Sequence, residues 1–283
     1  MRNIIKISAA VAAAAALSLG ASACSAPSDS SSGGKDDASS PLVVAASPTP
    51  HGAILRFVKD KLAEKEGLKL EVKELNDYIQ PNNLTNTGEV GANFFQHKPF
   101  LDEFNKKNGT HIVPVVNVAI EPLGLYSKKL DKLSDLKSGN TVAIPNDPSN
   151  QGRALKLLAD NGVITLKAGR HHRQARRRRG QEGPQAHRAG GAADRPRLAD
   201  VQAAVINGNF AIGAKLKPSE DSLALEKADG NPYANFLAVK QGNEDDERVK
   251  KLAKLLNSDE VKKFIEDKYK DGSVLPAFGP VKS

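Results

Sequence analysis

The stretch from Thr141 to Gly162 constrains the fold most, because it predicts a strand, a tight turn and a helix in direct succession. Thr141–Ile144 is a short apolar, β-branched run, which is typical of a buried strand. Turn-forming residues follow it, and Ser149 is placed as the N-cap of a leucine-rich helix that ends near Gly162. A buried strand that leads straight into a helix favours an α/β architecture.

Arg153 is the one cation in the first turn of this predicted helix. The N-terminus of a helix already carries partial positive charge, so a cation there gains nothing from the helix dipole. An anion bound at the turn would explain the arginine, because backbone N–H groups and a guanidinium fork would converge on one carboxylate. The alternative is that Arg153 is a solvated surface residue.

The beginning of the chain is typical of a lipoprotein leader. Basic residues precede Ile7–Leu19, an apolar run that is too short to anchor stably across a bilayer, and small residues lead up to Cys24. We expect residues 1–23 to be a lipoprotein signal peptide and Cys24 to carry the lipid. The alternative is ordinary secretion with cleavage after Ala23, which would leave Cys24 as a free thiol.

Residues 24–41 contain serines, glycines and charges with almost nothing to bury, so they are predicted to form a flexible tether. Acyl chains on Cys24 would hold the protein on the extracytoplasmic face of the cell membrane. Cys24 is the only cysteine, so we expect no intramolecular disulfide.

Strands and helices are predicted to alternate along most of the chain, which favours α/β lobes with largely parallel sheets. The segment after residue 269 is expected to be a short polar tail. Apolar runs predict strands at Leu42–Ala46, Leu68–Leu75, Thr110–Val118, Ile120–Tyr126, Val201–Asn207 and Asn235–Val239. Helical periodicity covers a segment opened by His51 and Gly52, together with Asn82–Val90, Leu101–Asn108, Leu133–Leu136, Asp246–Asn257 and Ser258–Tyr269.

Residues 170–197 differ in composition from everything around them. The segment holds nine arginines and no lysine, whereas the remainder of the chain holds four arginines and 28 lysines. Its nine arginines and two acids give it a net charge of +7, which leaves +1 of the chain's +8 for all other residues. The basic character therefore belongs to this segment, which has no apolar periodicity.

Three interpretations of the arginine-rich segment are open. It could be a basic arm for nucleic acid or another polyanion, or a solvated loop. It could also be a stretch translated in the wrong frame between two compensating frameshifts, which we favour because GC-rich DNA read out of frame encodes arginine, alanine, glycine and proline. Resequencing the gene tests this hypothesis, and an unaltered frame around codons 169 and 198 would exclude it.

Three longer motifs stand out: NFFQHKPF at 93–100, AIPNDPSNQGRAL at 143–155 and AVINGN at 204–209. They resemble the methionine-binding lipoprotein family, the solute-binding components of methionine-importing ABC transporters. The resemblance extends from about Leu42 to Phe278, apart from residues 170–197, and the lipobox-like Cys24 agrees with it.

The resemblance implies a type II periplasmic-binding-protein fold, in which two α/β lobes hold the ligand in a cleft between them. Residues 42–121, completed by 236–283, would form lobe 1, and residues 122–235 would form lobe 2. Arg153 would bind the ligand carboxylate bidentately, and Asn207 and Asn235 would offer oxygens to its ammonium. The walls of the side-chain pocket would be Tyr78, Phe95 and His97.

The function that the resemblance implies is capture of methionine and delivery to an ABC permease, without catalysis, cofactor, metal or nucleic acid. Aromatic walls suit a thioether, because its polarisable sulfur packs well against ring edges. One alternative is a binding protein for another small amino acid or peptide. A less favoured one is an enzyme on the same two-lobe scaffold, with His97 and a cleft carboxylate in acid–base roles. The last is a polyanion-binding surface protein that uses residues 170–197.

Overall fold

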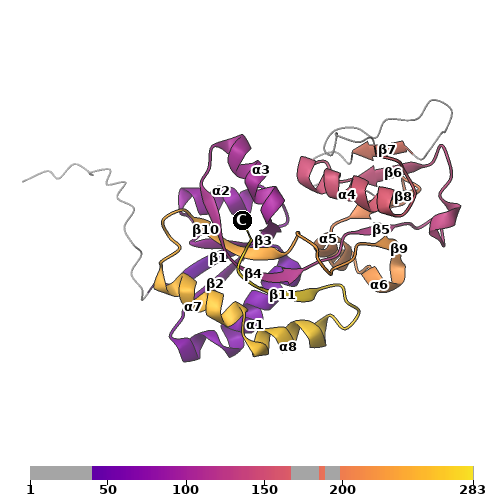
Figure 1. Cartoon of the computed structure of the whole chain (residues 1–283). Coiled ribbons are helices and arrows are strands. Elements are labelled where there is room, and N and C mark those ends of the chain that lie inside the picture. The colour runs from indigo at the N-terminus through magenta and orange to yellow at the C-terminus, as the bar shows by residue number, and fades with distance from the viewer. Residues whose placement is uncertain (1–39, 167–184, 189–197, 283) are drawn as a thin grey trace, which may run out of the picture. The chain divides into compact units, whose positions relative to one another are not determined.

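The computed structural model describes residues 40–166, 185–188 and 198–282, shown in Figure 1. The predicted signal peptide, Cys24, nearly all of the tether and most of the arginine-rich segment lie outside these residues. Within the described ranges, no helix combines the length and the apolar composition that crossing a membrane requires.

The first sheet has six strands in the order β11-β4-β10-β3-β1-β2. β1 pairs in parallel with β2 and β3, whereas β10 runs antiparallel to β3 and β4, and β11 runs antiparallel to β4. The strands are β1 Leu42–Ala46, β2 Leu70–Glu74, β3 Ala92–His97, β4 Ile112–Ile120, β10 Asn235–Lys240 and β11 Leu275–Gly279.

The second sheet has five strands in the order β7-β6-β8-β5-β9. β6 pairs in parallel with β7 and β8, and β5 runs antiparallel to β8 and β9. Both sheets are therefore mixed, so the expectation of largely parallel sheets is wrong. The strands are β5 Gly124–Tyr126, β6 Thr141–Ile144, β7 Gln185–Arg188, β8 Ala203–Ile206 and β9 Ser222–Leu225.

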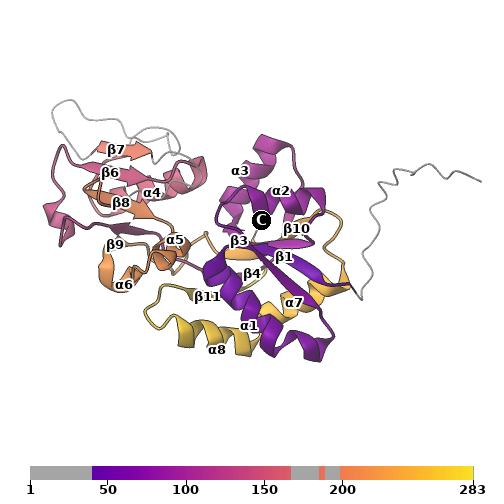
Figure 2. The same ribbon diagram turned by 180° about the vertical axis from the view of Figure 1, so that it is seen from behind.

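Helices cover both faces of the first sheet, as Figures 1 and 2 show from opposite sides. On one face, the apolar sides of α1, α7 and α8 pack on β1, β3 and β10 to form the largest core. On the other face, α3 buries Leu101 and Phe104 against Phe236 of β10. The helices are α1 Ala53–Lys61, α2 Gln80–Thr87, α3 Lys98–Asn108, α4 Pro148–Asp160, α5 Gly208–Gly213, α6 Pro218–Asp221, α7 Glu247–Leu256 and α8 Asp259–Lys268, with short helical turns at Pro48–Gly52, Ala63–Glu66 and Leu133–Asp135.

The second sheet has its own core on each face. The leucines of α4 pack on apolar side chains of β5, β6 and β8. On the opposite face, Tyr126 and Ile206 pack with Ala211 of α5. The chain passes from the first sheet to the second between β4 and β5, and it returns between β9 and β10.

The N-cap of α4 is Asp147, so the prediction of Ser149 is wrong. The side chain of Asp147 accepts a hydrogen bond of 2.8 Å from the backbone N–H of Asn150. Pro148 then occupies the first turn, where its missing N–H has no cost. Ser149 lies inside the helix, and its buried hydroxyl has no hydrogen-bond partner among the described residues. At the other end, Gly162 adopts a left-handed φ of +72°, which terminates the helix as expected.

Part of the arginine-rich segment is placed in the second sheet. Its residues 185–188 form β7, which pairs in parallel with all four residues of β6 at the edge of the sheet. The remaining residues of 170–197 lie outside the described residues, so the three interpretations of this segment stay hypotheses.

Candidate functional site

All six residues that the sequence predicted as ligand-binding line one cavity. The predicted residues are Tyr78, Phe95, His97, Arg153, Asn207 and Asn235. The remaining lining residues are Gln96, Phe100, Glu121, Asn150, Gly208 and Asn209.

The order of strands in the first sheet explains why residues distant in sequence meet here. β3 ends at His97, Glu121 follows directly after β4, and β10 begins at Asn235. Because β10 lies antiparallel between β3 and β4, its first residue pairs with the last residue of β3, His97, and with Ala119 of β4. Three segments thus place polar side chains at one edge of the sheet.

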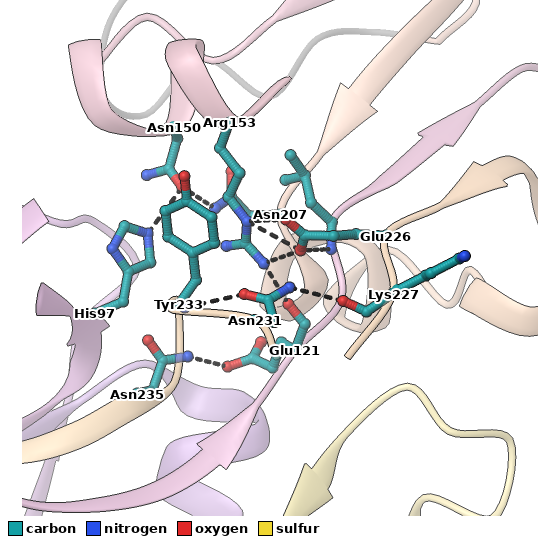
Figure 3. A network of polar contacts seen from close by, with 11 residues as sticks. His97, Glu121, Asn150, Arg153, Asn207, Glu226, Lys227, Asn231, Tyr233 and Asn235 are labelled. Carbon is teal, nitrogen blue, oxygen red and sulfur yellow. Dashed lines mark hydrogen bonds and ion pairs between the residues drawn. The ribbon is translucent and has the colours of Figure 1, made fainter. Parts of the chain in front are cut away.

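A chain of hydrogen bonds links His97 to the second sheet through Asn150 (Figure 3). The Asn150 side-chain oxygen lies 3.1 Å from His97 Nε2 and accepts from Asn207 Nδ2 at 2.8 Å. Asn150 Nδ2 points to the Asp147 carboxylate at 3.1 Å, which fixes the orientation of the amide. His97 Nε2 must therefore carry the proton and donate it, while Nδ1 accepts from the backbone N–H of Phe100 at 3.3 Å.

The same environment keeps His97 uncharged. Burial, followed by the positive charge of Arg153, lowers the pKa of His97 to about 3. Burial also raises the pKa of Asp147, against the opposing effect of its hydrogen bonds from Asn150. His97 therefore contributes a neutral ring and one fixed N–H donor to the site.

Arg153 is buried, with only 4% of its surface exposed, so the alternative of a solvated surface arginine is wrong. Its Nε lies 3.0 Å from both carboxylate oxygens of Glu226, and its Nη2 pairs with Glu226 and donates to the backbone oxygen of Glu121 at 2.9 Å. The ring of Tyr233 lies against the guanidinium, 4.4 Å from its central carbon to the ring centroid.

These contacts alter the expected geometry at Arg153. The Nε–Nη2 edge of the fork faces the protein's own carboxylate at Glu226, which is further held by the backbone N–H of Leu123 at 3.1 Å. None of these bonds uses Nη1. Among the described residues, this leaves Nη1 as the nitrogen with donors available for a ligand, where the sequence predicted a bidentate fork.

Glu121 brings a second carboxylate to the cavity. Its Oε1 accepts from Asn235 Nδ2 at 2.9 Å and lies 3.0 Å from His51 Nε2, and both side chains that carry these nitrogens are buried. The amide of Asn235 is thus oriented with its nitrogen toward Glu121, which leaves its oxygen as an acceptor.

Aromatic side chains line the other part of the cavity. The Tyr78 ring lies 5.9 Å from Phe95 and 5.8 Å from Phe100, between ring centroids, and it stacks on Phe210 at 5.0 Å. The Tyr78 hydroxyl donates to Asn209 Oδ1 at 2.6 Å, which orients the ring. Burial raises the pKa of this hydroxyl well above its usual range, so it remains protonated.

Sequence reasoning did not identify four residues of this network: Glu121, Asn150, Glu226 and Tyr233. Glu121 was visible as a lone acid in an apolar run, IEPLGLY, which is the predicted strand Ile120–Tyr126. Glu226 had no such signal, because it reaches Arg153 across 73 positions of sequence.

Comparisons with known proteins agree with this architecture. The methionine-binding lipoprotein MetQ of Bacillus subtilis is 38% identical over 254 residues, which cover 87% of this chain and 91% of the relative. A nutrient binding protein from Burkholderia cenocepacia, solved bound to methionine, is 41% identical, with a TM-score of 0.72 and coverage of 84% of this chain and 100% of that one. A periplasmic substrate-binding protein of an ABC transporter from Coxiella burnetii is 33% identical, with a TM-score of 0.76 and coverage of 83% and 100%.

The family model described as NlpA lipoprotein matches residues 42–278, the same limits within which the motifs resembled methionine-binding lipoproteins. The two sheets and the similarity to solved binding proteins confirm the expected two-lobe α/β fold. This chain therefore belongs to the NlpA lipoprotein family.

Proposed function

We propose that this chain is an extracytoplasmic substrate-binding lipoprotein that captures methionine and delivers it to an ABC permease. The observation that carries the proposal is one cavity that combines a buried guanidinium, amide oxygens and an aromatic wall. These groups complement the carboxylate, ammonium and thioether of methionine. The names of the Bacillus, Burkholderia and Coxiella relatives support the same function.

The polar groups divide between the two charges of an amino acid. Arg153 offers Nη1 to the carboxylate. Asn207 and Asn235 each use their side-chain nitrogen inside the protein, toward Asn150 and Glu121, so each has an oxygen left for the ammonium. A zwitterion held in this way leaves neither of its charges unpaired on leaving water.

The thioether would lie against Tyr78, Phe95 and His97. Sulfur packs favourably near aromatic ring edges, and a neutral imidazole adds no charge that an apolar side chain would have to desolvate. His97 is better suited to this role than to catalysis, because burial and Arg153 lower its pKa to about 3, so the ring stays neutral near neutral pH and is a weak base. Its Nε2 also faces an amide oxygen rather than a carboxylate.

The remaining assignments complete the proposal. Residues 1–23 are the signal peptide, Cys24 carries the lipid anchor on the extracytoplasmic face, and residues 24–41 are the tether. Residues 42–121 with 236–283 form lobe 1, residues 122–235 form lobe 2, and the loaded lobes dock on the permease. The protein catalyses no reaction.

A calorimetric titration of the full-length chain in detergent tests this function, with L-methionine, D-methionine and a panel of other amino acids. The proposal expects saturable heat that is selective for methionine. A chain that melts cooperatively but gives no heat with either methionine enantiomer contradicts it.

A further inference from the structure

We propose that the Glu121 carboxylate is the residue that selects a ligand with a free ammonium, and that binding depends more on this ammonium than on the ligand carboxylate. The inference rests on the proposed function and deepens it, because it states which end of an amino acid the cavity requires. It adds a charged acceptor to the two amide oxygens.

The first argument is the geometry of Glu121. Its side chain is 95% buried, with 5% exposed, and it lines the cavity. Both of its neighbours, Asn235 Nδ2 and His51 Nε2, lie at the same oxygen, Oε1. Oε2 makes no hydrogen bond to any residue in the described ranges, and Figure 3 shows it turned away from Asn235.

The second argument is the balance of charge. The guanidinium of Arg153 already faces the carboxylate of Glu226, so this pair is close to neutral. Glu121 has no arginine or lysine partner in the part of the chain that the structure describes, and the basic group beside it is the imidazole of His51. Burying a carboxylate with one unbonded oxygen costs free energy. An alkylammonium with three N–H donors removes that cost by pairing with the oxygen.

The third argument is the space next to Oε2. Gly208, which also lines the cavity, lies so close to Glu121 that a Cβ at position 208 would be 2.6 Å from Glu121 Cβ and 3.2 Å from Oε2. Any other residue there would collide with the Glu121 side chain at its Cβ and press against Oε2. Glycine leaves this space next to Oε2 unfilled, beside Asn207.

The consequence is an asymmetry between the two ends of the ligand. At the ammonium, Glu121 supplies a carboxylate that no arginine or lysine in the described ranges pairs with. At the carboxylate, Arg153 supplies Nη1 alone, from a cation that Glu226 has already neutralised. Losing the ligand's positive charge should therefore weaken binding more than losing its negative charge.

Two ligand analogues of matched size test this asymmetry on the parent chain. The α-hydroxy analogue of methionine replaces the ammonium by a hydroxyl, and L-methioninamide replaces the carboxylate by an amide. Calorimetric titration of the full-length chain in detergent should rank L-methionine first, L-methioninamide second and the hydroxy analogue last. A hydroxy analogue that binds as tightly as L-methioninamide, or more tightly, overturns the inference.

A pair of matched variants tests whether Glu121 causes the preference for a ligand with a free ammonium. Glu121→Gln keeps the shape of the side chain and an acceptor for Asn235 but removes the charge. Its affinity for L-methionine should fall by roughly ten- to a hundredfold, the range for a charge-assisted hydrogen bond. Its preference for L-methioninamide over the hydroxy analogue should shrink, because binding at the ammonium is weakened. Glu226→Gln should also shrink this preference, but by leaving the Arg153 charge free for the ligand carboxylate, so the hydroxy analogue should bind it more tightly than it binds the parent.

The outcomes separate the two proposals. If the parent chain binds no methionine, the proposed function fails and this inference fails with it. If the parent binds methionine and Glu121→Gln binds it within about twofold of the parent, only this inference fails. If Glu121→Gln does not melt cooperatively, the ranking of the two analogues on the parent chain decides.

Discussion

Replacing Arg153 by methionine should reduce both affinity and stability, for separable reasons. The affinity falls because the ligand carboxylate loses a charge-assisted hydrogen bond, which contributes about 1.5–3 kcal/mol. The stability falls because Glu226, only 17% exposed, loses its guanidinium partner. Removing one member of a buried ion pair costs about 3–5 kcal/mol, because the other charge remains without a partner.

The double variant Arg153→Met, Glu226→Gln distinguishes these effects. Replacing a whole buried ion pair by uncharged groups is often neutral for stability, so the double variant should regain most of the loss. It should not regain affinity for methionine. Thermal melts followed by circular dichroism measure stability, with about 2–4 °C expected for each kcal/mol, and calorimetric titration measures affinity. A single variant as stable as the parent, or a double variant that binds like the parent, refutes the reasoning.

Two further predictions concern α4 and His97. Asp147→Ala should lower the free energy of unfolding by about 0.5–2 kcal/mol, because α4 loses its N-cap. Ser149→Ala should change the free energy of unfolding by less. Equal effects of the two variants in thermal melts would argue against the capping role of Asp147. Because the folded protein holds the pKa of His97 near 3, below the usual value of about 6.5, protonation favours the unfolded state. Stability should thus decrease as the pH falls below about 6.5, and His97→Gln should reduce this pH dependence in melts between pH 7 and 4. An unchanged dependence of stability on pH in the variant would contradict the role of His97.

The strands that the sequence predicted best are short buried runs. β1 and β6 match the predicted limits Leu42–Ala46 and Thr141–Ile144, because apolar residues bounded by turn signals mark both ends. β11 was missed, since Leu275–Gly279 is half-buried, contains Pro276 and lies at the edge of its sheet. Its sequence shows neither a continuous apolar run nor strict alternation.

The directions of the strands within each sheet could not be predicted from the local sequence pattern. β10 runs antiparallel to its neighbours because the chain returns from the second sheet before β10 begins, and no residue within Asn235–Lys240 signals that return. The helix cap was misjudged for a different reason. Asp147 and Ser149 are both good N-cap residues, and the position of Pro148 in the first turn decides between them.

The candidate site was likewise predictable only in part from the sequence. Arg153 was identifiable because a cation at a helix N-terminus needs an anion, and the structure supplies one in Glu226. That this anion is a protein carboxylate could not be predicted, since the partner lies far along the chain. The six predicted residues line one cavity, but their contacts with the ligand remain predictions.

A crystal structure of the chain grown with L-methionine tests the central claim most directly. The account predicts methionine in the cavity, with its carboxylate at Arg153 Nη1, its ammonium between the side-chain oxygens of Asn207 and Asn235, and its sulfur against Tyr78 and Phe95. Methionine bound elsewhere, or bound in this cavity with its sulfur toward Arg153, would contradict the account.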